Sequence, residues 1–301
     1  MRHKHTLPVA ALLLGTSALA GTVPATAAVH GEPAGALRIL LTNDDGYDAP
    51  GIRLMFQRLT AAGYDVTIVA PLTNQSGAGT KMMSATTVTV RHPEPRVWAV
   101  EGTPGDAVSF GLAEVFADRA PDLVISGTNF GPNVAGLATH SGTVGGAVAA
   151  LESGVPAIAV STGGLTVPVP QLVLNAMRPT NDFTVKLIDR LRAHAKNGPL
   201  LPPGVGLNVD HPVVGADGTG TARGSAVTTQ DPQSFLKPDY TDSGDGTWKV
   251  DIKVVPQPAE QGSDAEAVAA DKVSITPISP DWNTGRAGFA TTAALLAGLR
   301  P

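Results

Sequence analysis

Short apolar runs alternate with helix-like segments along the first half of the chain. Residues 36–42 and 64–70 are apolar runs that predict buried strands, and residues 50–62 between them predict a helix. Pro50 stands at the first turn of this helix and Gly63 just past its end, which is the usual placement of both residues. A strand, a helix and a strand in this order predict a right-handed crossover between two parallel strands.

The same alternation continues to about residue 162. Strands are predicted over 86–91, 96–100, 123–126 and 157–161, and helices over 103–117 and 141–153. The first two of these strands would form a hairpin over residues 92–95, and Thr103 with Pro104 suits the start of a helix. We therefore expect an α/β fold with a Rossmann-like, doubly wound and mostly parallel sheet.

The second half of the chain gives a weaker pattern. It predicts helices over 183–195 and 287–299, strands over 205–209, 248–255 and 272–278, and a polar, Ala-rich stretch over 257–270. Residues 213–247 are rich in Gly, Thr, Ser and Asp, which indicates a hairpin, a loop or both. This half should form a smaller, β-rich C-terminal part.

The first 27 residues have the organisation of a cleaved signal peptide. Arg2 and Lys4 precede an apolar stretch over residues 7–20, and the residues at 25–27 fit the A-x-A cleavage pattern. A disordered start is the alternative, and the apolar stretch is short for a membrane span. We expect export to the periplasm or the cell exterior, with no membrane attachment after cleavage.

Composition excludes several classes of partner and site. The chain has 301 residues, a formal net charge of −5 and no cysteine. An acidic chain is a poor match for a nucleic-acid polymer, whose binding depends on Lys and Arg contacts to phosphates. Without cysteine, any metal must be held by oxygen or imidazole ligands.

Polar residues gather where the predicted strands end. Ligands bind at the carboxyl ends of the strands in open α/β sheets, so these positions are the candidate site. The residues concerned are Asp44, Asp45, Asn74, Gln75, Ser76, Asn129, Asn133, Ser141 and Thr143.

The adjacent pair Asp44–Asp45 is the most informative of these positions. An Asp-Gly turn explains one acidic residue, but two crowded carboxylates repel each other unless a cation compensates. Hard cations such as Mg²⁺ or Mn²⁺ take one or two carboxylates with neutral oxygens and water. Ser76 and Asn129 could supply neutral oxygens, although each taken singly is typical of a loop residue that bonds its own backbone.

Two further segments are candidates for contact with a phosphate. Residues 127–133 form a Gly-rich stretch that is neither a P-loop nor a dinucleotide fingerprint, and is otherwise a flexible turn. The start of the predicted helix at Ser141, Gly142 and Thr143 offers free backbone N–H groups and a positive dipole end, or simply a Ser141 cap. His140 could be a general acid for a leaving alcohol, or a structural residue.

Several motifs in a fixed order together resemble the SurE family of survival-protein phosphatases, the 5′/3′-nucleotidases. They are LLTNDDGYDAPG, APLTNQSGAG, EGTPGDAV, ISGTNFGPN, HSGTVGGAVAAL and VPAIAVS, followed by the weaker LNVDHP and VSITPISPDW. On this resemblance the family domain spans residues 28–285, with the Rossmann-like core over 37–162, the C-terminal part over 163–285 and a helix or tail over 286–301.

The resemblance implies an activity and a site. It implies metal-dependent hydrolysis of nucleoside 5′(3′)-monophosphates, a small phosphorylated substrate, sometimes polyphosphate hydrolysis, and assembly into a homodimer or homotetramer. The family's metal ligands match Asp44, Asp45, Ser76 and Asn129, with the two aspartates also catalytic. Positions near the phosphate site match Asn43, Gly77, Asn133, Ser141, Gly142 and Thr143.

The chain departs from the family pattern at some positions, and other functions remain open. His140 stands where a Tyr is common in the family, and residues 163–180 and 213–247 look unlike typical relatives. A non-catalytic, exported binder of nucleotides or polyphosphate is the alternative function, and a sugar-nucleotide transferase is a weaker one. Within the phosphatase hypothesis, the nucleophile is either a metal-bound water or, less favoured, an aspartate that forms an aspartyl-phosphate.

Overall fold

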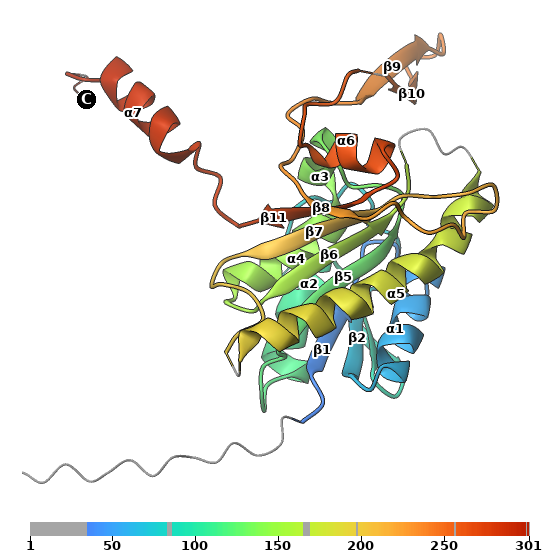
Figure 1. The fold of residues 1–301 in the computed structure, drawn as a ribbon. Coiled ribbons are helices and arrows are strands. Elements are labelled where there is room, and N and C mark those ends of the chain that lie inside the picture. The colour runs from blue at the N-terminus through green and yellow to red at the C-terminus, as the bar shows by residue number, and fades with distance from the viewer. Residues whose placement is uncertain are drawn as a thin grey trace, which may run out of the picture. The chain divides into compact units, whose positions relative to one another are not determined.

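Nine strands form one sheet in the order β3-β4-β2-β1-β5-β6-β7-β11-β8 (Figure 1). The computed structural model describes residues 35–82, 86–164, 169–196, 198–255, 257–298 and 300, so the expected signal peptide lies outside the described residues. The strands are β1 (Arg38–Thr42), β2 (Asp65–Pro71), β3 (Val90–Glu94), β4 (Val97–Val100), β5 (Leu123–Phe130), β6 (Ala157–Thr162), β7 (Gly206–His211), β8 (Ser225–Val227) and β11 (Val273–Ile278).

The central strands of this sheet run parallel, as the sequence predicts. Each neighbouring pair from β4 through β2, β1, β5 and β6 to β7 is parallel. Strand β3 is antiparallel to β4 at one end, and β11 is antiparallel to β7 at the other. The carboxyl ends of six strands therefore meet along one edge of the sheet, where the candidate residues lie.

Helices cover both faces of the sheet. They are α1 (Pro50–Ala61), α2 (Pro104–Phe110), the π-helix η1 (Gly111–Val115), α3 (Gly136–His140), α4 (Gly142–Glu152), α5 (Pro170–Ala195), α6 (Asp264–Ala269) and α7 (Gly285–Leu295). Alternate residues of β1 pack into opposite cores: Ile39 and Leu41 contribute to the core under α1 and α5, and Leu40 to the core under α2 and α4. This is the doubly wound arrangement that the alternating pattern predicts.

The structure corrects several predicted boundaries. The strand predicted over 123–126 continues as β5 to Phe130, so most of the Gly-rich stretch is strand rather than loop. The helix predicted over 103–117 is α2 followed by η1, and its capping box between Thr103 and Asp106 is present. In the hairpin, β3 starts only at Val90 and includes residues that were expected to form its turn.

Helix α5 differs most from the prediction, because it begins 13 residues before residue 183. Pro179 lies inside it, and an internal proline removes a helical hydrogen bond and normally ends a helical pattern. Buried hydroxyls stabilise the chain around it: Thr180 donates to the Ala176 carbonyl at 2.8 Å and Thr184 to the Thr180 carbonyl at 3.0 Å. The helix is held by its packing on α1 and the sheet, which residue propensity alone does not reveal.

The polar second half contributes more than loops. It adds β7, β11 and β8 to the main sheet, while β9 (Leu236–Asp242) and β10 (Trp248–Val254) form a separate antiparallel hairpin. Helix α7 has no buried residue among those described. In the described ranges, no helix combines the length and apolar character that crossing a membrane requires.

Helix α4 and the loop after β2 meet through their main chains. A Cβ atom built on Gly145 would lie 1.9 Å from the carbonyl oxygen of Gly79, so only glycine permits this approach. The loop is also fixed by a hydrogen bond from the Gly79 N–H to the His140 carbonyl at 3.2 Å. These contacts set the position of the loop that contains Ser76.

We predict that Gly145→Ala lowers the free energy of unfolding by about 1–3 kcal/mol, because the added methyl group overpacks this contact. The loss should occur even though alanine is the better helix former by about 1 kcal/mol. Urea denaturation followed by circular dichroism measures the change. Gly35→Ala is the control, since no heavy atom lies within 4 Å of its Cβ, and an equal loss in both variants would contradict the close-approach argument.

Candidate active site

Asp44 is the buried centre of the candidate site. It follows β1, exposes 3% of its surface, and its Oδ1 accepts a hydrogen bond of 2.7 Å from the Thr143 hydroxyl at the start of α4. Its carbonyl accepts a bond of 2.7 Å from the Gln75 N–H in the loop after β2. One residue thus joins three segments that are far apart in the sequence.

Asn43 closes the tight turn that follows β1. Its side-chain nitrogen donates to the Gly46 carbonyl at 2.9 Å, and its side-chain oxygen accepts from the Gly46 N–H at 3.3 Å. Gly46 has φ +110°, a conformation that side chains rarely adopt. Asn43, a predicted phosphate contact, is therefore engaged in holding the turn that presents the two aspartates.

The electrostatics of Asp44 and Asp45 favour a cation. Burial is the main cause that raises the pKa of Asp44, although the Thr143 hydroxyl lowers it in part. Burial, and then repulsion from Asp44, raises the pKa of Asp45 to about 6, against a lowering contribution from the Phe130 N–H. Two carboxylates that resist ionising together become favourable ligands once a divalent ion neutralises them.

The loop after β2 places Ser76 and Gly77 near this pair. Ser76 is exposed and its N–H donates to the Asn74 side-chain oxygen at 2.8 Å, while Gly77 has φ +81°. The contact between Gln75 and the Asp44 carbonyl lies one residue before Ser76. The Ser76 hydroxyl is therefore on a segment tied directly to the aspartate turn.

Asn129 reaches the site from β5. It is 9% exposed, and its Nδ2 donates to the Gly131 carbonyl at 2.9 Å, which leaves the amide oxygen as the atom able to contact a cation. The next residue, Phe130, donates its backbone N–H to Asp45 Oδ2 at 3.4 Å. Asn129 thus adjoins the backbone that contacts Asp45.

The residue set fits a hard divalent ion. Two carboxylates, a hydroxyl and an amide oxygen are oxygen donors of the type that Mg²⁺ or Mn²⁺ takes together with water. In the part of the chain that the structure describes, no group of three or more His, Cys, Asp or Glu side chains could hold a metal. A site here would rely on only two such groups, with neutral oxygens completing it.

The start of α4 lies directly against Asp44. The Ser141 hydroxyl caps the helix by accepting a hydrogen bond of 3.1 Å from the Val144 N–H, which is the capping role that the sequence predicts. Backbone hydrogen bonds from Thr143 and Gly142 also lower the pKa of Asp44. The positive end of the helix dipole is therefore directed at the same place as the carboxylates, where it favours anionic groups.

His140 ends α3 immediately before this helix. Its side chain is exposed, and its carbonyl is the group that accepts from Gly79. An exposed imidazole at this position can meet a bound ligand from solvent. A role as general acid is a hypothesis that stands on this position alone.

Asn133 is tied inward. Its N–H donates to Asp210 Oδ1 at 2.6 Å, its side-chain nitrogen donates to the Ser161 hydroxyl at 2.8 Å, and its carbonyl accepts from Asn208 Nδ2 at 2.8 Å. These bonds occupy the backbone N–H and the side-chain nitrogen of Asn133, a residue that the sequence predicts to contact phosphate. Its observed contacts anchor the segment after β5 to β6 and β7.

Sequence reasoning missed Asn208 and Asp210 as individual residues. Both are about 1% exposed, and Asn208 Nδ2 also donates to Asp210 Oδ2 at 3.1 Å. The signal was available in the motif LNVDHP, where polar residues two positions apart interrupt an apolar strand on one face. Such a pattern indicates a buried polar network rather than a simple core strand.

The fold and the side chains at the carboxyl edge of its sheet define this chain as a doubly wound α/β protein with an acidic pair at that edge. The sequence model of the survival protein SurE family matches residues 39–236, and the chain belongs to this family. By that membership the chain is an enzyme of the hydrolase class.

Individual relatives match over nearly their full length. A "5′-nucleotidase SurE" of Rhodopseudomonas palustris (strain BisB5) is 36% identical over 269 residues, covering 86% of this chain and 100% of the relative. Another of Thermosynechococcus vestitus is 34% identical, covering 83% of this chain and 93% of the relative. The crystal structure of the SurE protein from Aquifex aeolicus has a TM-score of 0.70 and 29% identity, covering 86% of this chain and 99% of that one.

The buried carboxyl of Asp210 predicts a pH-dependent stability. Burial raises its pKa to about 7, although the Asn133 N–H and the Asn208 amide lower it. The pKa of an unfolded Asp is about 3.9, so protonation of Asp210 stabilises the folded state fully below that pH. This contribution is lost as the pH rises through about 7.

We therefore expect Asp210→Asn to gain stability relative to the wild type between about pH 4 and 7, by on the order of 1–4 kcal/mol. Urea denaturation at several pH values measures the difference. Asp217→Asn is the control, because hydrogen bonds from Thr219 lower the pKa of this exposed carboxyl and the trend should be weak and opposite. A pH-independent difference for Asp210→Asn would refute the assignment.

Proposed function

We propose that this chain is a divalent-metal-dependent phosphomonoesterase that hydrolyses nucleoside monophosphates to nucleoside and phosphate. The observation that carries the proposal is the buried Asp44, set against the start of α4 and followed directly by the half-buried Asp45. The substrate class comes from the relatives named 5′-nucleotidase SurE. Hydrolysis of polyphosphate is a further activity to be tested with the same protein.

Asp44, Asp45, Ser76 and Asn129 would hold the ion, Mg²⁺ or Mn²⁺. When bound, such an ion neutralises phosphate charge and lowers the pKa of a water ligand. The hydrogen bond from Thr143 fixes the orientation of the Asp44 carboxylate, and the Phe130 N–H does the same for Asp45. Both aspartates are thus oriented by the protein before a substrate arrives, which avoids a reorganisation cost during the reaction.

The start of α4 would stabilise the phosphoryl group. The helix dipole provides positive potential at Gly142 and Thr143, which suits a dianion bound beside Asp44. His140, exposed beside this helix start, would give a proton to the leaving nucleoside oxygen. Water is the proposed nucleophile, and single-turnover hydrolysis in ¹⁸O-water should transfer the label to phosphate without a trapped phosphoprotein.

Asp44 and Asp45 are the charged ligands of the proposed metal site. Asp44→Asn and Asp45→Asn should each lower kcat/KM for nucleoside monophosphates by at least about 100-fold, because each removes a charged ligand. Phosphate release is measured with Mg²⁺, Mn²⁺ or a chelator, and titration calorimetry of Mn²⁺ reports ion binding separately. Wild-type rates and ion binding in either variant would remove that residue from the site.

Asp48→Asn is the matched control for these variants. Asp48 belongs to the same turn region but is exposed and bonded to Arg53 at 3.0 Å, so its loss should leave phosphate release unchanged. A chelator should abolish activity in the wild type, and added Mg²⁺ or Mn²⁺ should restore it. Undiminished activity in the chelator would contradict metal dependence.

We also propose that the chain assembles into a homodimer or homotetramer. The support is apolar surface outside the main sheet: Val250 and Ile252 alternate along one face of β10 with 53% and 58% exposure, and Phe289 on α7 is 74% exposed. Burial of such side chains in water is favourable, so they suit contacts between copies of the chain.

Ile252→Asp should therefore reduce the oligomer to a smaller species, because it would bury a charge in the contact. Light scattering coupled to size-exclusion chromatography gives the mass. Lys249→Ser, on the opposite face of β10, should leave the mass unchanged. A monomeric wild type would overturn this proposal.

A further inference from the structure

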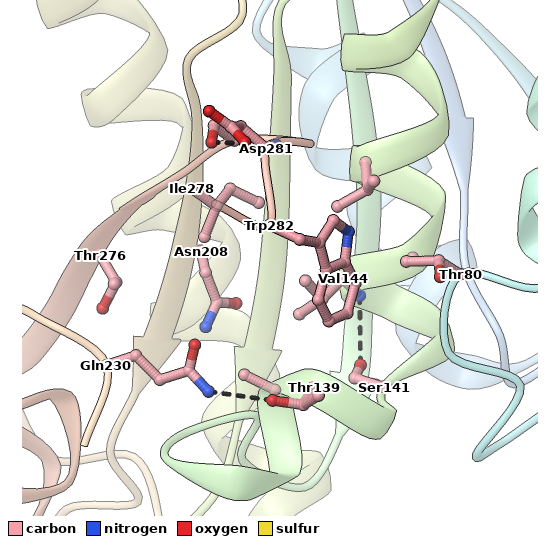
Figure 2. Close-up of a pocket in the computed structure, with 14 residues that line it drawn as sticks. Thr80, Thr139, Ser141, Val144, Asn208, Gln230, Thr276, Ile278, Asp281 and Trp282 are labelled. Carbon is pink, nitrogen blue, oxygen red and sulfur yellow. Dashed lines mark hydrogen bonds between the residues drawn. The ribbon is translucent and has the colours of Figure 1, made fainter. Parts of the chain in front are cut away.

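A cavity of about 180 Å³ lies beside the candidate active site (Figure 2). Its walls come from the end of α3, one face of α4, strands β7 and β11, and the segment that follows β11. Asp44 and Asp45 do not line it, so it is a different space from the proposed metal site. Ser141 lines the cavity and also begins the helix whose next two residues contact Asp44.

Asn208 presents an unpaired hydrogen-bond acceptor at this cavity. Its Nδ2 donates to the Asn133 carbonyl, which can only accept, and this fixes which amide atom is the oxygen. Among the described residues, Oδ1 has no hydrogen-bond partner although the side chain is 1% exposed. A buried acceptor without a partner is costly, so a ligand N–H placed there would be favoured.

The remaining walls are apolar or uncharged. Val144 and Ile278 provide apolar surface, and the Trp282 ring lies in the same cavity with 70% of its surface exposed (Figure 2). Gln230 uses its Nε2 to donate to the Ala135 carbonyl at 2.7 Å and the Thr139 hydroxyl at 3.2 Å, which leaves its oxygen as a second acceptor. Asp281 is the one charged residue among those lining the cavity.

These features select the chemistry of the ligand. Without a Lys or Arg in its lining, and with Asp281 present, the cavity disfavours a phosphate or a carboxylate. Acceptors set among apolar side chains, with an exposed indole, suit a flat, neutral ring that has N–H donors. Nucleobases combine these properties, and they stack on aromatic side chains.

We propose that this cavity binds the base of a nucleoside, with a base N–H donating to Asn208 Oδ1 and the ring stacking on Trp282. Ser141 is shared between the cavity and the start of α4, so a nucleotide could place its base on one side of this residue and its phosphate on the other. Assignment of the base to the substrate rests on the proposed function. Binding of a free nucleoside does not.

Calorimetric titration of the full chain with adenosine tests the cavity directly. Trp282→Ala should weaken adenosine binding at least about fivefold, as expected for a lost stacking contact, and Trp282→Phe should retain most of the affinity. Trp248→Ala, which removes an exposed tryptophan on β10, should bind as the wild type does. Absence of binding up to about 10 mM adenosine, or equal affinity in Trp282→Ala, overturns the proposal.

The contact with Asn208 is tested from the ligand side, because Asn208 also holds Asn133 and its substitution would disturb the fold. Purine riboside lacks the amino group of adenosine, so it leaves the acceptor unpaired. It should bind the wild type about tenfold more weakly. Equal affinity for the two nucleosides rejects the hydrogen bond to Asn208.

Kinetic measurements decide whether the base in the cavity belongs to the substrate or to a separate nucleoside. If it belongs to the substrate, the ratio of kcat/KM for adenosine 5′-monophosphate to that for ribose 5-phosphate falls in Trp282→Ala and stays unchanged in Trp248→Ala. If adenosine binds but this ratio does not move, the cavity is a nucleoside site separate from the substrate. Should the wild type release no phosphate at all, the phosphatase proposal fails, while the adenosine titration still decides on the cavity.

Discussion

The placement of two adjacent carboxylates at the end of β1, one buried and one half-buried, is the constraint on which the site depends. Neither Asp44 nor Asp45 ionises easily there, because burial raises both pKa values and repulsion from Asp44 raises that of Asp45 further. The surrounding structure compensates with directed donors, namely the Thr143 hydroxyl and the Phe130 N–H. One donor comes from the start of α4 and the other from the end of β5, so both elements must be in place before the pair can be tolerated.

Much of this arrangement is local in origin and therefore predictable. The strand, helix and strand from 36 to 70, the N-cap at Thr103 and the cap at Ser141 follow from short-range patterns, and the structure confirms them. The strand-end rule predicts Asp44, Thr143 and Asn129 at one edge of the sheet. What the rule could not give is which side-chain atoms are already engaged.

What the sequence did not predict has long-range causes. Helix α5 begins at Pro170 and continues through Pro179 because it packs on α1 and the sheet. The phosphate contact of Asn133 stays a prediction, but its observed partners Ser161, Asn208 and Asp210 lie 28, 75 and 77 residues away along the chain. Polar contacts between residues so far apart produce no repeating pattern in the sequence. The one indication of them is the pair of polar residues within the apolar strand LNVDHP.

The approach of Gly145 to the Gly79 carbonyl has a consequence for how this site can diversify. The loop with Ser76 is fixed to the rest of the protein through backbone atoms at Gln75 and Gly79, and within the loop the Asn74 side chain accepts from the Ser76 N–H. Exposed side chains of that loop other than Asn74 can therefore be exchanged while the main chain beneath Ser76 keeps its course. Substitutions at the loop surface can change which substrates the protein accepts. The conformation of the aspartate turn stays the same.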